Sequence, residues 1–302
     1  MIRRTLRLPV AALVAMLMAS ACGGVGSSIA LSGSPGVDHD SAEHDGPKRI
    51  VSISTVATEM LFAIGAGHRV VAVDSMSNFP SDAPVTDLSG FEPNVEAILG
   101  FAPDLVVLSY DPGDVVAGLD VAGVATLLLG AAQTIADTYS QIETLAVATG
   151  DEDAAATLVA EMKAEMAALT DSVQSLEQPL SYYHELDNTL YTVTSTTFIG
   201  EVYALAGLVN VADPADPDGS AWGYPQVSAE YLLNADPDII FLADTKCCAQ
   251  DVAAVAARPG WANLTAVSRG RVVELDDDVA SRWGPRIVEF LRSIVQAVNA
   301  ID

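Results

Sequence analysis

Short apolar runs alternate with longer amphipathic stretches along residues 48–302. The short runs are rich in Val, Ile and Leu and are bounded by Gly, Pro or Asp, which is typical of buried strands. Because strands and helices alternate, the pattern predicts an α/β protein with mainly parallel central sheets flanked by helices. The predicted strands are residues 49–53, 70–74, 105–108 and 125–129 in a first lobe, and residues 180–186, 190–193, 239–242 and 272–275 in a second.

The longest helical stretch, residues 134–172, is rich in Ala, Leu, Glu and Met and contains a single glycine, Gly150. Gly150 is expected to divide it into two helices, the second of which forms a long link between the lobes. The chain therefore divides into an N-terminal lobe (48–133), a helical connector (134–177) and a C-terminal lobe (178–302). Further helices are predicted at residues 56–64, 198–205, 229–234, 251–256 and 285–298.

An internal repeat relates the two predicted lobes. Residues 96–108 read EAILGFAPDLVVL and residues 230–242 read EYLLNADPDIIFL, with Glu, aliphatic positions, Pro-Asp and an apolar strand at identical spacing. We interpret this as one unit used twice, in which a short helix is ended by Pro and followed by a buried parallel strand. The alternative is coincidence between two ordinary helix–strand units.

The first 21 residues are typical of an export signal. Arg3, Arg4 and Arg7 precede an apolar run that is too short to span a bilayer comfortably. The run ends in Ala19-Ser20-Ala21-Cys22, which resembles a bacterial lipobox and predicts lipidation of Cys22. The alternative is ordinary cleavage after Ala21. Residues 22–47, rich in Gly, Ser and Asp, are expected to form a flexible tether.

Charge and cysteine content narrow the function further. The formal net charge of −26 disfavours nucleic acid as a partner and argues against strongly anionic ligands. Cys247 and Cys248 are adjacent, and in an oxidising compartment we expect them to form a vicinal disulfide, with two free thiols as the alternative. The chain has no G-x-S-x-G elbow, no H-E-x-x-H motif and no phosphate loop, so a hydrolase is disfavoured.

Several local motifs carry a family resemblance. These are RIVSISTVATEMLFAIGAG, FPSDAP and SGFEPNVEAIL in the first lobe, and WGYPQVSAEYLL and SRWGPRI in the second. They resemble the substrate-binding lipoproteins of ABC importers for iron complexes and vitamin B12, the class III solute-binding proteins, above all the BtuF-type cobalamin-binding proteins. The resemblance covers residues 48–302 and implies that a small-molecule ligand binds between the lobes.

The resemblance also implies roles for individual residues. Phe91 and Tyr224 stand where the family has cleft aromatics, although the cobalamin-binding pattern has Trp at both places. Tyr191 and Trp222 are further aromatic candidates, and core packing is the alternative for each. Asp278 and Arg282 stand where the family places polar groups that reach the ligand. The alternative is that Arg282 pairs with one of the acids in 276–278.

Glu96 and Glu230 occupy equivalent places in the two repeat copies. In the family, one Glu on each lobe pairs with Arg residues of the two permease subunits, so the resemblance implies docking to a permease dimer. The alternative is that both are exposed glutamates favoured by a helix N-terminus. His184 could ligate haem iron, but a lone His on a strand is more often a packed residue.

Together these features predict an exported, lipid-anchored binding protein at the extracytoplasmic face of a bacterial membrane. It would capture a cobalamin-like corrinoid and deliver it to an ABC permease with its ATPase, with no catalytic residues, metal or cofactor. The lipid anchor would be its only membrane contact. The alternatives are a ferric-siderophore or haem ligand, and a surface scavenger without a permease.

Overall fold

The computed structural model describes residues 46–301. The predicted signal sequence, the lipidation site at Cys22 and almost all of the predicted tether lie outside the described residues. Among the helices of residues 46–301, none combines the length and apolar character that a bilayer crossing requires.

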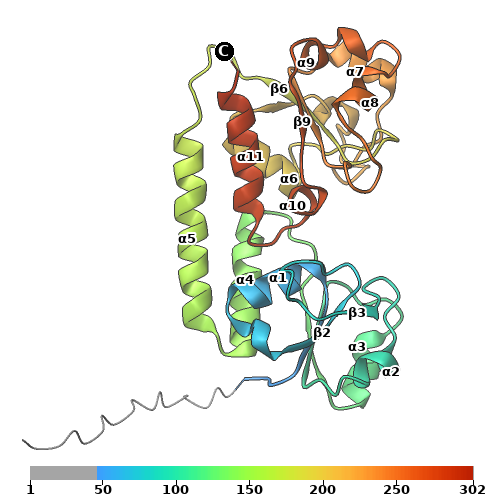
Figure 1. The fold of residues 1–302 in the computed structure, drawn as a ribbon, viewed down its shortest axis with the longest axis vertical. Coiled ribbons are helices and arrows are strands. Elements are labelled where there is room, and N and C mark those ends of the chain that lie inside the picture. Colours follow the sequence, from blue (N-terminus) through green and yellow to red (C-terminus); the bar gives the residue numbers. More distant parts are fainter. Residues whose placement is uncertain (1–45, 302) are drawn as a thin grey trace, which may run out of the picture. The chain divides into compact units, whose positions relative to one another are not determined.

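The first lobe is built on a parallel five-stranded sheet (Figure 1). Its order is β3-β2-β1-β4-β5, and two inner strands, β1 (Ile50–Ile53) and β4 (Leu105–Leu108), are fully buried, as expected for strands that are apolar except at Ser52. The remaining strands and helices are β2 (Val70–Asp74), β3 (Val85–Leu88), β5 (Ala125–Leu128), α1 (Thr55–Ala63), η1 (Ala66–Arg69), α2 (Val95–Leu99) and α3 (Val115–Val121).

The second lobe has a parallel four-stranded sheet of order β7-β6-β8-β9. Its strands are β6 (Ser181–Glu185), β7 (Val209–Asn210), β8 (Ile239–Leu242) and β9 (Val272–Glu274). The helices are α6 (Phe198–Leu205), η2 (Asp213–Ala215), α7 (Ala229–Ala235), α8 (Val252–Ala256), η3 (Trp261–Asn263), α9 (Thr265–Ser268), α10 (Asp277–Ser281) and α11 (Ile287–Asn299). Two lobes with parallel sheets flanked by helices confirm the predicted fold class.

Two long helices, α4 (Ile135–Thr149) and α5 (Glu152–Asp171), lie between the two sheets in the sequence. A capping box of Thr134 and Asp137 begins α4, and Gly150, with φ of 77°, ends it, which confirms the predicted break. Helix α4 packs on α1 of the first lobe, and α5 packs on α11 of the second. The lobe and connector boundaries themselves stay predictions.

The repeat is confirmed down to the backbone. Both copies consist of a short helix followed by a fully buried strand, α2 and β4 in the first and α7 and β8 in the second. The residue before each Pro has a positive φ, 48° at Ala102 and 45° at Asp236. The Asp after each Pro then binds the start of the neighbouring strand. Asp104 accepts hydrogen bonds from the backbone of Lys48 and Arg49, ahead of β1, and Asp238 accepts from the backbone N–H of Ser181, at the start of β6.

Three details of the strands differ from the sequence prediction. The predicted strand at 190–193 is wrong, because this segment makes one isolated antiparallel bridge, Tyr191 with Gln226, outside the sheet. Strand β7 has two residues and is too short to leave a periodic signal. Edge strand β3 was not predicted either, because its sequence, VTDL, is half exposed and breaks the apolar pattern.

Candidate binding site at the carboxyl ends of the strands

The carboxyl ends of parallel strands lie along one edge of a sheet, where ligands of open α/β folds bind. In the first lobe, the residues that follow these ends line a cavity of about 380 Å³ together with a segment of the second lobe that follows α10. The cavity therefore lies where the two lobes meet. Its lining residues are Ile53, Ser54, Thr55, Asp74, Met76, Gly90, Phe91, Ser109 and Tyr110 from the first lobe, and Ser281, Arg282 and Trp283 from the second.

Aromatic and hydroxyl groups dominate the first-lobe wall. Phe91 is 71% exposed and is held in place by Tyr110, whose hydroxyl donates to the Phe91 carbonyl at 2.6 Å. The hydroxyls of Ser54 and Ser109 lie 2.5 Å apart, and Ser54 also caps α1. Such a wall can cover an apolar ring and bind the polar groups around it.

Asp74 is the buried acid of this wall. Its carboxylate accepts hydrogen bonds from the Met76 N–H at 2.7 Å and from the Ser77 hydroxyl at 3.0 Å. Burial raises the pKa of Asp74 above its ordinary value. Both of these hydrogen-bond donors to the Asp74 carboxylate thus belong to the turn that directly follows β2.

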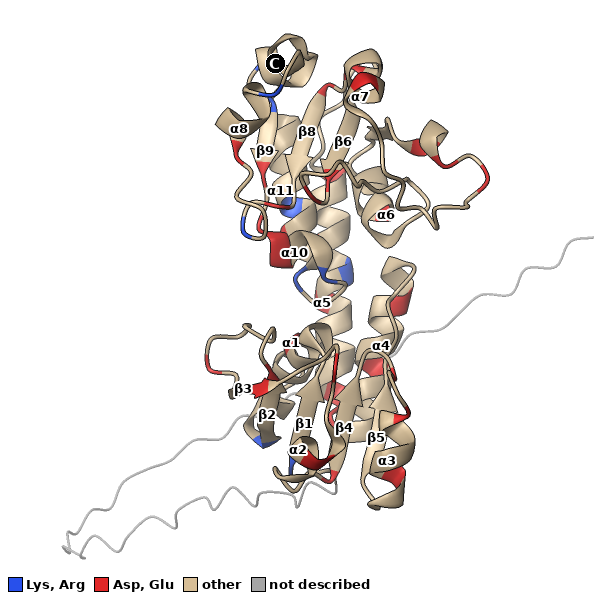
Figure 2. Cartoon of the chain, turned by 90° about the vertical axis from the view of Figure 1, so that its right-hand side faces the viewer, with Lys and Arg blue, Asp and Glu red and all other residues tan. Residues whose placement is uncertain are grey.

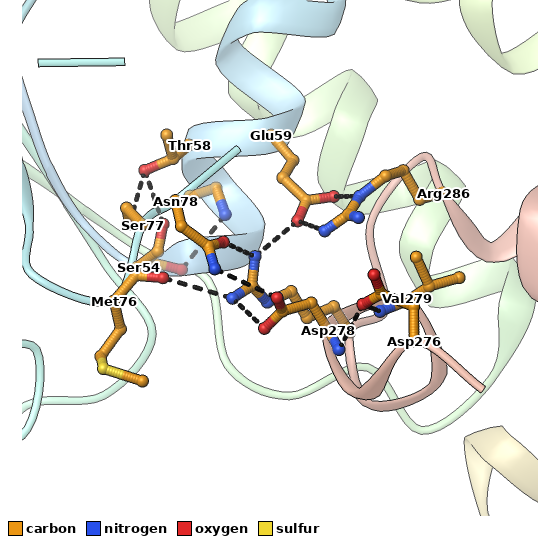
Figure 3. Close-up of polar contacts among 12 residues, drawn as sticks. Ser54, Thr58, Glu59, Met76, Ser77, Asn78, Asp276, Asp278, Val279 and Arg286 are labelled. Carbon is orange, nitrogen blue, oxygen red and sulfur yellow. Dashed lines mark hydrogen bonds and ion pairs between the residues drawn. The ribbon is translucent and has the colours of Figure 1, made fainter. Parts of the chain in front are cut away.

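Arg282 is buried in an ion-pair cluster that joins the lobes (Figure 3). Its guanidinium donates to Glu59 of α1 at 2.9 Å and to Asp278 at 2.7 Å. It also donates to the Asn78 side chain and the Met76 carbonyl. Asp278 is therefore the acid of 276–278 that pairs with Arg282.

The loop after β8 is held by the acids that follow β9. The carboxylate of Asp277 accepts hydrogen bonds from the backbone N–H groups of Thr245, Lys246 and Cys247. Lys246 pairs with Asp276 at 2.7 Å and with Asp278 at 2.9 Å. These polar contacts order the loop without a covalent link.

The structure has Cys247 and Cys248 as free thiols, which was the alternative, and the vicinal disulfide stays a prediction. Burial, with Cys248 and nearby acids adding to it, raises the pKa of the Cys247 thiol to about 12. A thiol of such high pKa stays protonated and is a poor nucleophile.

Tyr191, Trp222 and Tyr224 form a separate exposed group on two paired segments of the second lobe. Trp222 is 87% exposed, and the two tyrosines are each 43% exposed, so none of them is a core residue. The segments are joined by the Tyr191–Gln226 bridge and by the Thr192 N–H, which donates to the Pro225 carbonyl. The cavity brings Phe91 together with Arg282, whereas these three aromatics do not line it.

His184 is a core residue, which was the alternative to iron ligation. Its ring is fully buried against Phe290, and Nδ1 lies 2.8 Å from the Tyr203 hydroxyl. Burial lowers its pKa to about 3, so the ring is neutral. Within residues 46–301, no group of three His, Cys, Asp or Glu side chains is arranged to hold a metal ion.

Comparison with known proteins agrees with this geometry. A family model described as periplasmic binding protein matches residues 50–279. This chain belongs to the periplasmic binding protein family. Membership places it outside the cytoplasm, with a small-molecule ligand and a permease partner, and confirms the resemblance drawn from the motifs.

Relatives of this periplasmic binding protein bind different ligands. It is 32% identical to a cobalamin-binding protein of Halobacterium salinarum, over 84% of this chain and 70% of that protein. The vitamin B12 binding protein BtuF of Vibrio cholerae is 26% identical, with a TM-score of 0.65 over 84% of this chain and 99% of that structure. The haem-binding protein RhuT of Roseiflexus is 25% identical, with a TM-score of 0.72 over 84% of this chain and 98% of that structure.

Glu96 and Glu230 occupy the same position in the first turn of α2 and α7, and both are exposed. The caps of these helices are other residues, since Asn94 accepts from the Ala97 N–H and Ser228 accepts from the Tyr231 N–H. Neither glutamate forms an ion pair within the part of this periplasmic binding protein that the structure describes. Both carboxylates are thus accessible to a partner.

Among the residues that line the cavity, sequence reasoning named only Phe91 and Arg282, and it also missed Glu59 of the ion-pair cluster. A usable signal exists for Tyr110, because it comes two residues after the buried strand β4. No local signal marks Glu59, whose partners lie more than 200 positions away in the sequence.

Proposed function

We propose that this protein captures a cobalamin-like corrinoid and delivers it to an ABC permease. One observation carries the proposal: the cavity where the lobes meet joins an exposed aromatic wall and several hydroxyls to an arginine that is already paired. Sequence relatives that bind cobalamin or vitamin B12 support the same ligand.

The cavity suits a corrinoid for physical reasons. A corrin ring offers a broad apolar surface, which aromatic side chains bury at low cost in conformational entropy. Its periphery carries amides, which hydroxyls and backbone groups can bind without a net charge. A cavity of about 380 Å³ takes only part of such a ligand, so Tyr224, Tyr191 and Trp222 on the second lobe are proposed to cover the rest.

Haem is the second candidate ligand, because a structure of similar fold binds it. The buried His184 cannot reach a ligand between the lobes, so a tyrosine would have to supply the iron ligand. The exposed phenols of Tyr110, Tyr191 and Tyr224 are the available groups. Nothing in the described residues singles out a ferric siderophore.

A titration of the unlipidated protein, carrying Cys22→Ser, tests the ligand. We expect one-site binding of cyanocobalamin at micromolar or tighter affinity, and none of haem or ferrichrome. Phe91→Ala and Tyr224→Ala should each weaken binding about tenfold, because each removes an aromatic contact face. Val147→Ala, at an exposed position on α4, is the control. Binding of haem alone would transfer the function to the second candidate.

Delivery to the permease is proposed to use Glu96 and Glu230, with lipidated Cys22 keeping the protein at the membrane. In cells whose own copy is deleted, Glu96→Gln combined with Glu230→Gln should abolish uptake of labelled cobalamin and leave its affinity unchanged. The matched control is Glu143→Gln with Glu161→Gln, two exposed helix glutamates on α4 and α5. Normal uptake in cells with the Glu96→Gln and Glu230→Gln protein would reject the docking role. Loss of uptake with unchanged affinity would reject a scavenger without a permease.

A further inference from the structure

Glu59 binds two arginines of the opposite lobe. Its carboxylate is almost fully buried and accepts from Arg282 at 2.9 Å, and from Nε and Nη2 of Arg286 at 2.9 and 2.5 Å (Figure 3). Ion pairs buried in this way are strongly coupled, because removing one partner leaves the other charge unpaired in a medium of low dielectric constant. Among the described residues, loss of the Glu59 carboxylate would therefore leave Arg286 without an ion-pair partner and Arg282 with Asp278 alone.

The charges joined by ion pairs around Glu59 are balanced, and Asp74 is a further acid on the same cavity wall as Arg282. Three carboxylates, those of Glu59, Asp276 and Asp278, face three cations, those of Lys246, Arg282 and Arg286. Every cation of the cluster has at least one carboxylate within ion-pair distance. Arg282, which forms part of the cavity wall, has two.

Within residues 46–301, no other cation lies at the carboxyl ends of the strands that meet at the cavity. The loops that follow β1 to β5 at these ends contain no Lys or Arg up to the next element. After β8, the remaining arginine, Arg258, is bound to the buried Glu185. Arg49 and Arg271 directly precede β1 and β9 and so lie at the opposite, amino ends. Figure 2 shows Lys and Arg in blue around α10 and at the far ends of β2 and β9. Positive charge at the cavity is therefore present only in neutralised form.

We propose that Glu59 is a specificity-determining residue that sets the charge of the accepted ligand. By neutralising Arg282 and Arg286 it makes the cavity accept neutral, amide-bearing ligands and reject carboxylate-bearing ones. The inference rests on the proposed function only in that the ligand binds at this cavity. If Glu59 served only to link the lobes, its loss would weaken all ligands alike.

Matched probes that differ mainly in charge separate these roles. Dicyanocobinamide carries amides around the corrin ring, and dicyanocobyrinic acid carries carboxylates at those positions. Haem and its dimethyl ester form a second pair with and without free carboxylates. In the full-length protein, Glu59→Gln should raise affinity for the acidic member relative to the neutral one at least tenfold. The gain should shrink as salt is added, because screening weakens a charge interaction.

Three further variants keep the test decisive. Asp278→Asn also uncovers Arg282 and should shift selectivity in the same direction, which covers the case that Glu59→Gln fails to fold. Adding Arg282→Gln to Glu59→Gln should remove the gain. Asp151→Asn, which removes the carboxylate partner of the buried Arg69 far from the cavity lining, should leave selectivity unchanged.

The outcomes for the two proposals are distinguishable. If folded Glu59→Gln and Asp278→Asn keep the selectivity of the natural protein, the role of Glu59 is overturned whichever ligand binds. If the natural protein binds none of the four probes, the proposed corrinoid function fails. The role of Glu59 is then still supported by acquired binding of the acidic probes in the variants, and is overturned if they acquire none.

Discussion

The two copies of the repeat share a scaffold and differ in the residues after it. Up to the ends of β4 and β8, both copies have a side-chain helix cap, a Glu in the first helical turn and a positive φ before the Pro. Each copy also has an Asp after the Pro that accepts a hydrogen bond from the backbone at the start of the neighbouring strand, which we call the Asp clamp. Beyond the strands, Ser109-Tyr110 in the first copy corresponds to Ala243-Asp244 in the second. The first pair lies on the cavity wall, whereas Asp244 is fully buried. The two copies therefore share a scaffold, and the residues after each strand determine whether that strand contributes to the cavity wall.

Asp244 belongs to a second buried cluster in the C-terminal lobe. Glu185 is bound by both Nη atoms of Arg258, at 2.5 and 2.6 Å. Neither carboxylate oxygen of Asp244 has a hydrogen-bond partner within residues 46–301. Burial, and then the nearby charge of Glu185, raises the pKa of Asp244 to about 7. The second copy thus has a buried acid, Asp244, where the first copy has the partly exposed Tyr110.

The largest expected effect comes from this acid. Because its folded pKa lies above the ordinary value, the folded protein binds an extra proton between about pH 4 and 7, and stability falls as pH rises through that window. Asp244→Asn cannot ionise, so it should be more stable than the natural protein at pH 8 by on the order of 2–4 kcal/mol, with little difference at pH 4. Urea unfolding at four pH values measures this.

Tyr110→Phe is the matched control at the equivalent position, since it removes a hydroxyl and no carboxylate. Its stability difference from the natural protein should be the same at pH 4 and pH 8. An Asp244→Asn difference that does not change with pH would contradict the assignment of a raised pKa to this residue.

The Asp clamps should give the next largest effect. Asp104→Ala and Asp238→Ala each remove a carboxylate that accepts two hydrogen bonds at the start of a central strand. Each should lower the free energy of unfolding by about 1.5–3 kcal/mol, with the larger loss at the less exposed Asp238. Asp120→Ala on the exposed face of α3 should change it by less than about 0.5 kcal/mol. A loss in only one copy would mean that the clamps are not equivalent.

Substitutions at the two positive-φ positions, Ala102 and Asp236, should change the stability least, and the two changes should have opposite signs. Ala102 has φ of 48° and a side chain that gains nothing there, so Ala102→Gly should stabilise the fold by about 0.5–1 kcal/mol. Asp236, at the same place in the second copy, accepts from the Thr265 N–H and hydroxyl. Asp236→Gly should therefore destabilise the fold despite the relief of backbone strain. Thermal unfolding of both variants checks the difference in sign.

Strands β4 and β8 could be predicted because their residues are apolar on both faces, and β1 matches that signal except at Ser52. The short edge strand β7 could not, because two residues carry no periodicity. In the site, the exposure of Phe91 and Tyr224 agrees with loops that contain Pro and Gly. Their role in binding, like that of Glu96 and Glu230 in docking, stays a prediction.

The fold class, the repeat and the family could be recognised from the sequence, because they depend on local periodicity, spacing and short motifs. The charge of the cavity wall, in contrast, depends on which side chains meet in the folded protein. Glu59 looks like an ordinary helix residue in the sequence, and Arg282 looks available to a ligand. Folding brings them within 2.9 Å of each other, because a buried carboxylate and a buried guanidinium are stable only as partners.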